Sequence, residues 1–217
     1  MNMRITKIES QQKNPGRKSI YADGEFVVGV SDETLLRAGL RTGDEITDER
    51  IRALVQEEET SSAKRVALRF LAHRPRTKKE IRDKLREKEF AEPEIKQTIE
   101  NLERVGLLND TEFARMYVRD ALAAKPTGRM LLKRKLLMLG VEKSTVDETL
   151  QNAFADIDER EAALDAGRKF LRKSISVRKA GHEANLRHRL ASFLTRRGYS
   201  WETIEPTLKA LLKESDE

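Results

Sequence analysis

Apolar residues recur along most of the chain at spacings of three and four, which is the period of an amphipathic helix. Between residues 65 and 110 this spacing predicts three short helices. The same arrangement returns twice further along, so most of the chain is expected to be one helical unit in three copies. A single unit buries little apolar surface, which predicts that the copies stack into an elongated, curved array.

Two numerical offsets relate the copies: adding 51 leads from the first copy to the second, and adding 58 leads from the second to the third. Five positions are apolar in every copy, namely Ile81, Leu85, Phe90, Ile95 and Ile99, then Leu132, Leu136, Val141, Val146 and Leu150, then Leu190, Leu194, Tyr199, Ile204 and Leu208. The first helix of each copy has its own offset, with apolar pairs Phe70-Leu71, Tyr117-Val118 and Phe170-Leu171. Linkers of different length explain this difference, because loops tolerate insertions.

Only residues 1–30 have the alternation and the β-branched content of strands. The Asp23-Gly24 dipeptide predicts a tight hairpin turn, since both residues tolerate positive φ angles. The sequence AsnProGlyArg at residues 14–17 predicts an earlier turn. We therefore expect a small three-stranded meander at the N-terminus.

Helix signals follow the strands. Ser31 is expected to cap a short helix that ends at Gly39, and Thr47 is expected to cap a second helix. That second helix should extend towards His73, with a break near residues 60–62, and Pro75 should stop it. Within the second and third copies, glycines at 140 and 198 are expected to end the second helix, whereas the first copy has Glu89 at that position.

These patterns predict a mainly α-helical chain with four parts. We expect an N-terminal β-rich extension with a short helix at 1–47, a first repeat with its lead-in helix at 48–110, a second repeat at 111–157 and a third repeat at 158–217.

Composition agrees with thin helical layers. The chain is 38% hydrophobic and 37% charged, which is too polar for one thick core. It has no cysteine, which excludes disulfides and thiolate metal sites. We find neither an apolar signal core nor a window long enough to cross a bilayer, so we expect a soluble, cytoplasmic protein.

Catalytic patterns are missing from the sequence. We find no phosphate-binding glycine loop, no nucleophile elbow and no metalloprotease motif. His73, His182 and His188 have no metal-ligand spacing, and acidic pairs such as Asp147-Glu148 or Asp156 with Asp158 and Glu159 are interpreted as helix caps and solvated charges. We therefore expect a binding protein, not an enzyme, with no cofactor and no metal.

Positive charge recurs at the second helix of each copy. Residues 63–90 carry a balance of +7 and residues 165–198 a balance of +8, whereas residues 144–161 carry −5. Stacked copies would align these side chains into a basic stripe able to follow a phosphate backbone. The predicted stripe consists of Arg76, Lys78, Lys79, Arg82, Arg129, Lys133, Arg134, Lys135, Arg187, Arg189, Arg196 and Arg197. Four aromatic residues are expected to pack inside or between repeats instead of stacking on bases, namely Phe113, Tyr117, Tyr199 and Trp201.

Three segments resemble the RecX family of bacterial regulatory proteins. They are ArgPheLeuAlaHisArgProArgThrLysLysGluIleArgAspLysLeu at 69–85, GlyLeuLeuAsnAspThrGluPheAlaArgMetTyrValArg at 106–119 and PheLeuThrArgArgGlyTyrSerTrpGluThrIle at 193–204. The resemblance spans about residues 63–212 and leaves out the N-terminal strands. It implies nine helices in three repeats and a protein, without catalytic activity, that lies along the RecA filament on single-stranded DNA. It further implies restraint of strand exchange, ATP turnover and repressor cleavage.

Three functions are compatible with the sequence. The resemblance favours a monomeric modulator of the RecA filament with weak or indirect contact to single-stranded DNA, active in DNA repair and the SOS response. A stand-alone nucleic-acid-binding protein without RecA contact would instead bind DNA tightly and with strong salt dependence. A helical scaffold for some other protein would show neither activity.

Overall fold

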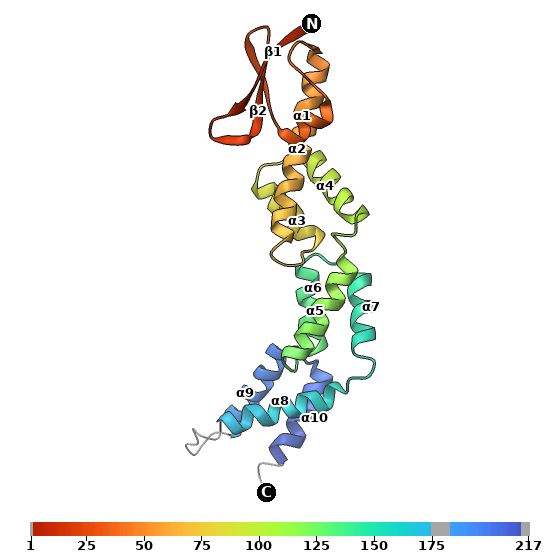
Figure 1. The fold of residues 1–217 in the computed structure, drawn as a ribbon. Helices are drawn as coiled ribbons and strands as arrows, with labels where there is room; N and C mark the ends of the chain where they lie inside the picture. The colour runs from red at the N-terminus through yellow and green to blue at the C-terminus, as the bar shows by residue number, and fades with distance from the viewer. Residues whose placement is uncertain (1, 175–182, 214–217) are drawn as a thin grey trace. The chain divides into compact units, whose positions relative to one another are not determined.

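A computed structural model describes residues 2–174 and 183–213. The chain forms two compact units, Met1–Pro75 with Ile81–Leu107 and Arg76–Glu80 with Leu108–Glu217. The described residues include ten helices, and all their strands belong to the N-terminal part (Figure 1). The predicted mainly helical chain with a small N-terminal set of strands is thus confirmed.

The first unit contains an antiparallel sheet in which the strands lie in the order β3-β2-β1-β4. The strands are β1 (Asn2–Gln11), β2 (Asn14–Ala22), β3 (Glu25–Ser31) and β4 (Glu45–Thr47). The first three form the predicted meander. The prediction of only three strands is wrong, because β4 pairs with the other edge of β1, where Met3 lies opposite Ile46. Three residues are too few to show an alternating pattern, so β4 depends on the edge that β1 offers.

One of the two predicted turns is confirmed and one is misplaced. Asp23 and Gly24 have φ angles of 50° and 87° and connect β2 to β3. The earlier turn lies at residues 12–13, and residues 14–17 already belong to β2, with Gln11 opposite Asn14. The strand tolerates Pro15 because the proline stands near its start, where the ladder is irregular and no backbone donor is needed.

The helix caps at the end of the sheet are as predicted. Ser31 accepts a hydrogen bond from Thr34 N at the start of α1 (Asp32–Ala38), and Gly39 ends that helix with φ 66°. Thr47 caps α2 (Asp48–Leu71). The expected break at residues 60–62 is wrong, since α2 is continuous there. Thr60 Oγ1 donates to the carbonyl oxygen of Gln56 (3.0 Å), so this polar segment bonds back into its own helix.

A buried carboxylate ties α2 to the sheet of the first unit. Glu58 is only 6% exposed. Its Oε2 accepts from Ser31 N, Ser31 Oγ and Thr34 Oγ1 at 2.8–2.9 Å, and its Oε1 accepts from Arg17 (2.7 Å) and Arg65 (3.0 Å). Burial by itself would raise the pKa of Glu58, but the hydrogen bonds from Ser31, Thr34 and Arg65 outweigh it, so its pKa lies below the ordinary value.

The repeat is visible in the packing of the remaining helices. They are α3 (Lys78–Glu87), α4 (Glu92–Arg104), α5 (Asp110–Ala124), α6 (Arg129–Met138), α7 (Lys143–Ala153), α8 (Glu159–Ser174), α9 (Glu183–Arg197) and α10 (Trp201–Lys213). Of the fifteen apolar repeat positions, fourteen are buried and Phe90 is half-buried. Helices α5–α7 surround one apolar core of the second unit and α8–α10 surround another. The predicted part boundaries at 47, 110 and 157 stay a prediction.

Candidate partner-binding surface

In the second unit, the N-terminus of α6 is bonded directly to the C-terminus of α9. The backbone N–H of Gly128 donates to the carbonyl of Arg197 (2.9 Å), and that of Met130 donates to the carbonyl of Gly198 (3.0 Å). A Cβ on Gly128 would lie 2.3 Å from the Gly198 oxygen, and one on Gly198, whose φ is 88°, would lie 2.2 Å from Leu131 Cβ. Both glycines are therefore required for this close approach.

The same joint occurs at the other end of α6. Thr77 Oγ1 donates to the carbonyl of Leu139 (2.6 Å), and Lys79 Nζ donates to that of Met138 (3.0 Å). The segment Arg76–Glu80 belongs to the second unit, so this joint lies within that unit. Gly140 has φ 84°, and a Cβ there would lie 2.4 Å from Lys79 Cβ. The two joints are formed by equivalent positions of successive copies, as the offsets of 51 and 58 show. Together they hold α6 at both ends.

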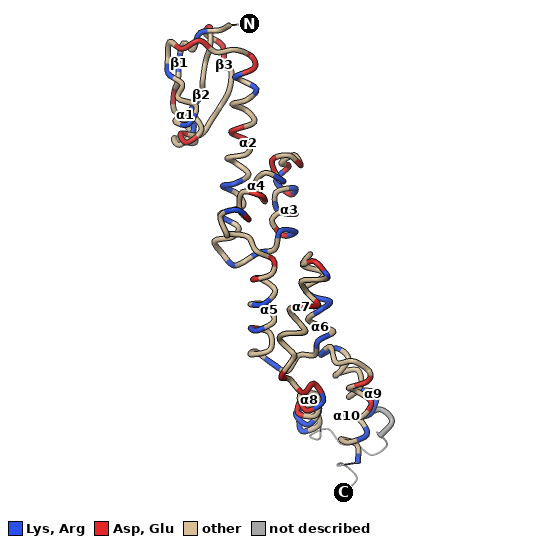
Figure 2. The backbone as a smooth tube through the Cα atoms, turned by 90° about the vertical axis from the view of Figure 1, so that its right-hand side faces the viewer, with Lys and Arg blue, Asp and Glu red and all other residues tan. Residues whose placement is uncertain are grey.

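Five residues of the predicted stripe point into solvent from two helices of the second unit. They are Arg134 and Lys135 on α6 and Arg187, Arg189 and Arg196 on α9. Within the described residues they form no hydrogen bond or ion pair. Figure 2 shows the blue segments that mark Lys and Arg on α6. Cations without partners keep their charge available for an external ligand.

Other members of the stripe have structural partners. Arg76 pairs with Glu80 (3.2 Å), Lys133 pairs with Asp147 (2.6 Å), and Lys79 bonds to the end of α6. Lys78 donates its backbone N–H to Asp110 (2.9 Å). Arg82 is half-buried and belongs to the first unit.

The two arginines at the joint of α6 and α9 stack on aromatic rings. Arg129 lies over Phe154 (5.1 Å), and Arg197 lies over Phe193 (5.2 Å) and donates to the carbonyl of Pro126 (3.2 Å). Phe193 in turn stacks on Phe170 with ring centroids 4.7 Å apart. Such contacts hold a guanidinium in one orientation.

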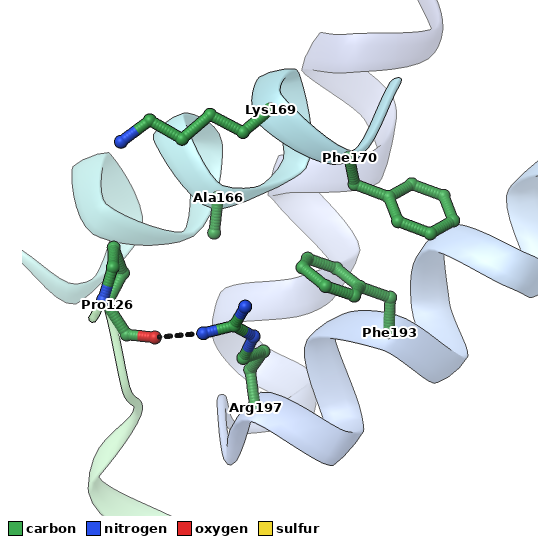
Figure 3. Close-up of a pocket in the computed structure, with 6 residues that line it drawn as sticks. All are labelled: Pro126, Ala166, Lys169, Phe170, Phe193 and Arg197. Atoms are coloured by element: carbon green, nitrogen blue, oxygen red, sulfur yellow. Dashed lines mark hydrogen bonds between the residues drawn. The ribbon is translucent and has the colours of Figure 1, made fainter. Parts of the chain in front are cut away.

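A small pocket of about 180 Å³ lies beside Arg197 (Figure 3). Its lining is Pro126, Ala166, Lys169, Phe170, Phe193 and Arg197. Lys169 is an exposed cation at this pocket and does not belong to the predicted stripe. In the sequence, Lys169 is distinguished only by its place in the basic segment 165–198. Residues 175–182 of that segment lie outside the described part of the chain.

Of two acidic residues interpreted as helix caps, one is a cap and the other is not. Asp147 is not a helix cap: it lies inside α7 and pairs with Lys133, and this hydrogen bond is the largest cause of its lowered pKa. Asp158, in contrast, caps α8 through the backbone N–H groups of Arg160 and Glu161, as expected. The sequence could not show the Lys133–Asp147 pair, because it forms between two helices.

The aromatic residues pack as expected, with one exception. Phe113 and Tyr199 are buried, and Tyr117 stacks on Phe113 with a centroid distance of 6.0 Å. Burial raises the pKa of Tyr199 to about 12. Trp201 is 59% exposed, so its expected packing is wrong. It begins α10 one turn before the first buried residue, Ile204, and therefore lies beyond the core.

Sites for metals or membranes are not observed in residues 2–174 and 183–213. No group of three or more His, Cys, Asp or Glu there could hold a metal ion. No helix in these ranges is both long and apolar enough to span a bilayer. His73 and His188 are exposed, and His182 lies outside the described residues.

Comparisons with known proteins point to one family. Residues 63–102 and 109–150 match the family models described as the first and second three-helix domains of RecX. "Regulatory protein RecX" of Clostridium acetobutylicum is 31% identical over 214 residues, 98% of each chain. The chain belongs to the RecX family. Residues 3–47 match the RecX N-terminal domain, so the strands that the sequence resemblance left out are also part of the family pattern.

Further RecX proteins agree with this assignment. The "Regulatory protein RecX" of Clostridium perfringens is 33% identical over 208 residues, 96% of each chain. A solved structure titled "Crystal structure of regulatory protein RecX" has a TM-score of 0.72 at 25% identity and covers 94% of this chain and 97% of its own. RecX from Lactobacillus salivarius, with a TM-score of 0.60 at 23% identity over 71% of this chain and 97% of its own, supports the fold alone.

Proposed function

We propose that this chain is a non-enzymatic regulator that binds the RecA filament on single-stranded DNA. It inhibits the recombinase, ATPase and coprotease activities of RecA, in DNA repair and the SOS response of the cytoplasm. Membership of a family of regulatory proteins supports a regulatory role. The RecA partner rests on what the family resemblance implies.

The observation that carries the proposal is a set of cations on α6 and α9 that have no ion-pair partner among residues 2–174 and 183–213. Arg134, Lys135, Arg187, Arg189 and Arg196 are exposed on two helices joined by backbone hydrogen bonds. Cations on a rigid support neutralise phosphates with little loss of chain entropy, and the released counterions favour binding. Five such charges give modest affinity for bare DNA, so selective binding to the filament requires protein contacts as well.

The test is ATP hydrolysis by the cognate RecA on single-stranded DNA, titrated with substoichiometric amounts of this protein. The affinity for the same bare DNA is measured in parallel. We expect inhibition at concentrations well below those that coat the DNA. Inhibition only after the DNA is saturated would contradict a filament-directed regulator and favour a stand-alone nucleic-acid-binding protein.

A charge-reversal variant tests the surface. We expect Arg134→Glu with Lys135→Glu to weaken filament and DNA binding and to lower the slope of log affinity against log salt by about two. Lys133 is left unchanged, because it pairs with Asp147. The matched control is Lys125→Glu with Lys143→Glu, which changes the same number of exposed charges outside the stripe. Equal losses in both variants would show an effect of net charge only.

A further inference from the structure

The outward face of α6 is apolar, although it points into solvent. Met130 is 56% exposed, Leu137 41% and Met138 68%. At 100° per residue these three side chains lie within about 60° of Arg134. Leu132 and Leu136, which are fully buried, point in nearly the opposite direction. We call Met130, Arg134, Leu137 and Met138 the α6 outer face.

The other two copies of the repeat show that the fold does not require apolar residues there. The equivalent positions are Lys79, Asp83, Arg86 and Glu87 in the first copy and His188, Ser192, Thr195 and Arg196 in the third. All eight are polar or charged, and only Ser192 among them is half-buried instead of exposed. A surface that is polar at all four positions in two copies and apolar at three of the four in the second copy indicates a specific contact there.

The joints at both ends of α6 determine which side faces outward. Backbone hydrogen bonds connect its start to α9, and Thr77 and Lys79 bind the carbonyls at its end. The helix therefore cannot rotate to bury its outer face. That apolar surface is available for burial only by something outside the unit.

Charge restricts what can cover this face. The sequence of α6 contains four cations and no acid. Lys133 is paired with Asp147 and Arg129 lies on Phe154, which leaves Arg134 and Lys135 around the apolar side chains. A second copy would place like charges against each other, and DNA phosphates would leave the apolar side chains in water. An apolar groove edged by carboxylates satisfies both kinds of side chain, and methionine adapts its shape to such a groove.

We propose that the α6 outer face is the protein-contacting part of the surface and binds an apolar, carboxylate-edged site on RecA. This proposal rests on the proposed function, because it takes the RecA filament as the partner. It assigns Met130, Leu137 and Met138 to RecA and leaves the exposed arginines of α9 for phosphate.

The experiment compares filament binding with DNA binding in a charge-preserving variant. Met130→Gln, Leu137→Thr and Met138→Gln are combined, and affinities are measured for the RecA filament and for bare single-stranded DNA. We expect at least about tenfold weaker binding to the filament, since buried apolar contacts dominate interfaces, with DNA affinity changed less than about twofold. The loss should persist at high salt, unlike that of Arg134→Glu with Lys135→Glu.

A control variant removes other exposed apolar side chains. Val105→Thr with Leu107→Gln acts at residues that are 61% and 55% exposed, and it should leave filament binding unchanged. Circular dichroism and the midpoint of thermal unfolding establish that each variant is folded. Met138→Gln alone, at the most exposed position, provides a milder variant with an expected loss of the same sign.

The outcomes separate the two proposals. If the wild-type protein binds no filament, the proposed function fails together with this inference. If the wild type binds and the triple variant binds equally well, only the α6 assignment is overturned. Equal loss of DNA affinity, or a wild-type dimer that the triple variant dissociates in sedimentation, would also overturn it by showing that DNA or a second copy covers the face.

Discussion

The contacts that stabilise the first unit internally differ in kind from those that stabilise the second. In the first unit, one buried carboxylate, Glu58, receives hydrogen bonds from the sheet, α1 and α2. In the second unit, backbone meets backbone at Gly128 and Gly198, where no side chain has room. The first kind of contact is electrostatic and depends on pH, whereas the second is steric. Substitutions should therefore distinguish the electrostatic stabilisation of the first unit from the steric fit in the second.

The largest effect is expected at the glycine joint. Gly198→Ala adds a Cβ that would lie 2.2 Å from Leu131 Cβ and 2.4 Å from its backbone nitrogen, at a φ of 88°. Steric overlap and the left-handed backbone together should lower the free energy of unfolding by at least about 3 kcal/mol. Chemical denaturation monitored by circular dichroism measures this loss.

A substitution at a second glycine distinguishes the cost of a left-handed backbone from the cost of steric overlap. Gly106 also has a positive φ, 73°, but a Cβ there would meet nothing within 4 Å. Gly106→Ala should therefore lower the free energy of unfolding by only about 1 kcal/mol, the cost of placing alanine at a positive φ. Equal losses for Gly106→Ala and Gly198→Ala would mean that the close approach to α6 contributes nothing.

An intermediate effect is expected from Glu58→Gln. The amide keeps the shape but removes the charge that Arg17 and Arg65 share, and we expect a loss of about 2 to 3 kcal/mol. Glu57→Gln is the matched control. Glu57 forms a half-exposed pair with Arg50, worth less than about 1 kcal/mol.

The difference in stability between the wild type and Glu58→Gln should depend on pH. Because the pKa of Glu58 is lowered in the folded state, the unfolded state binds its proton more readily. Its contribution is therefore fully present above the unfolded pKa of about 4.3 and is lost as the pH falls through the folded pKa. The wild-type stability should approach that of Glu58→Gln below pH 4. A constant difference across this range would contradict the role of the charge.

The smallest effect is a gain at Glu89. This residue has φ 62° at the position where the other copies have Gly140 and Gly198. Glu89→Gly should relieve left-handed strain and raise the free energy of unfolding by about 1 kcal/mol, partly offset by the greater freedom of glycine when unfolded. Ala123→Gly, at an exposed helical position of α5, should lower it by up to about 1 kcal/mol. A loss in Glu89→Gly would show that its side chain has a stabilising contact.

Local signals accounted for the helices, the caps and one turn. Ser31, Gly39 and Thr47 act within a few residues of themselves, so their patterns are readable in the sequence. The strand β4 was missed because it needs a partner more than forty residues away. For the candidate site, the sequence located all the cations of α6 and α9 but not which of them were free, since Lys133 finds Asp147 on another helix.

By itself, the sequence determined that three copies of a three-helix unit follow an N-terminal strand region, because apolar spacing is a local property of each helix. The repeat register placed Leu132 and Leu136 inward, and only the tertiary structure showed that the apolar side chains on the opposite face of α6 stay exposed. That face depends on two joints formed by Thr77, Lys79, Gly128 and Gly198, residues distant from one another along the chain. The methionines of α6 resemble core residues in the sequence, and their exposure results from the way the ends of the helix are held.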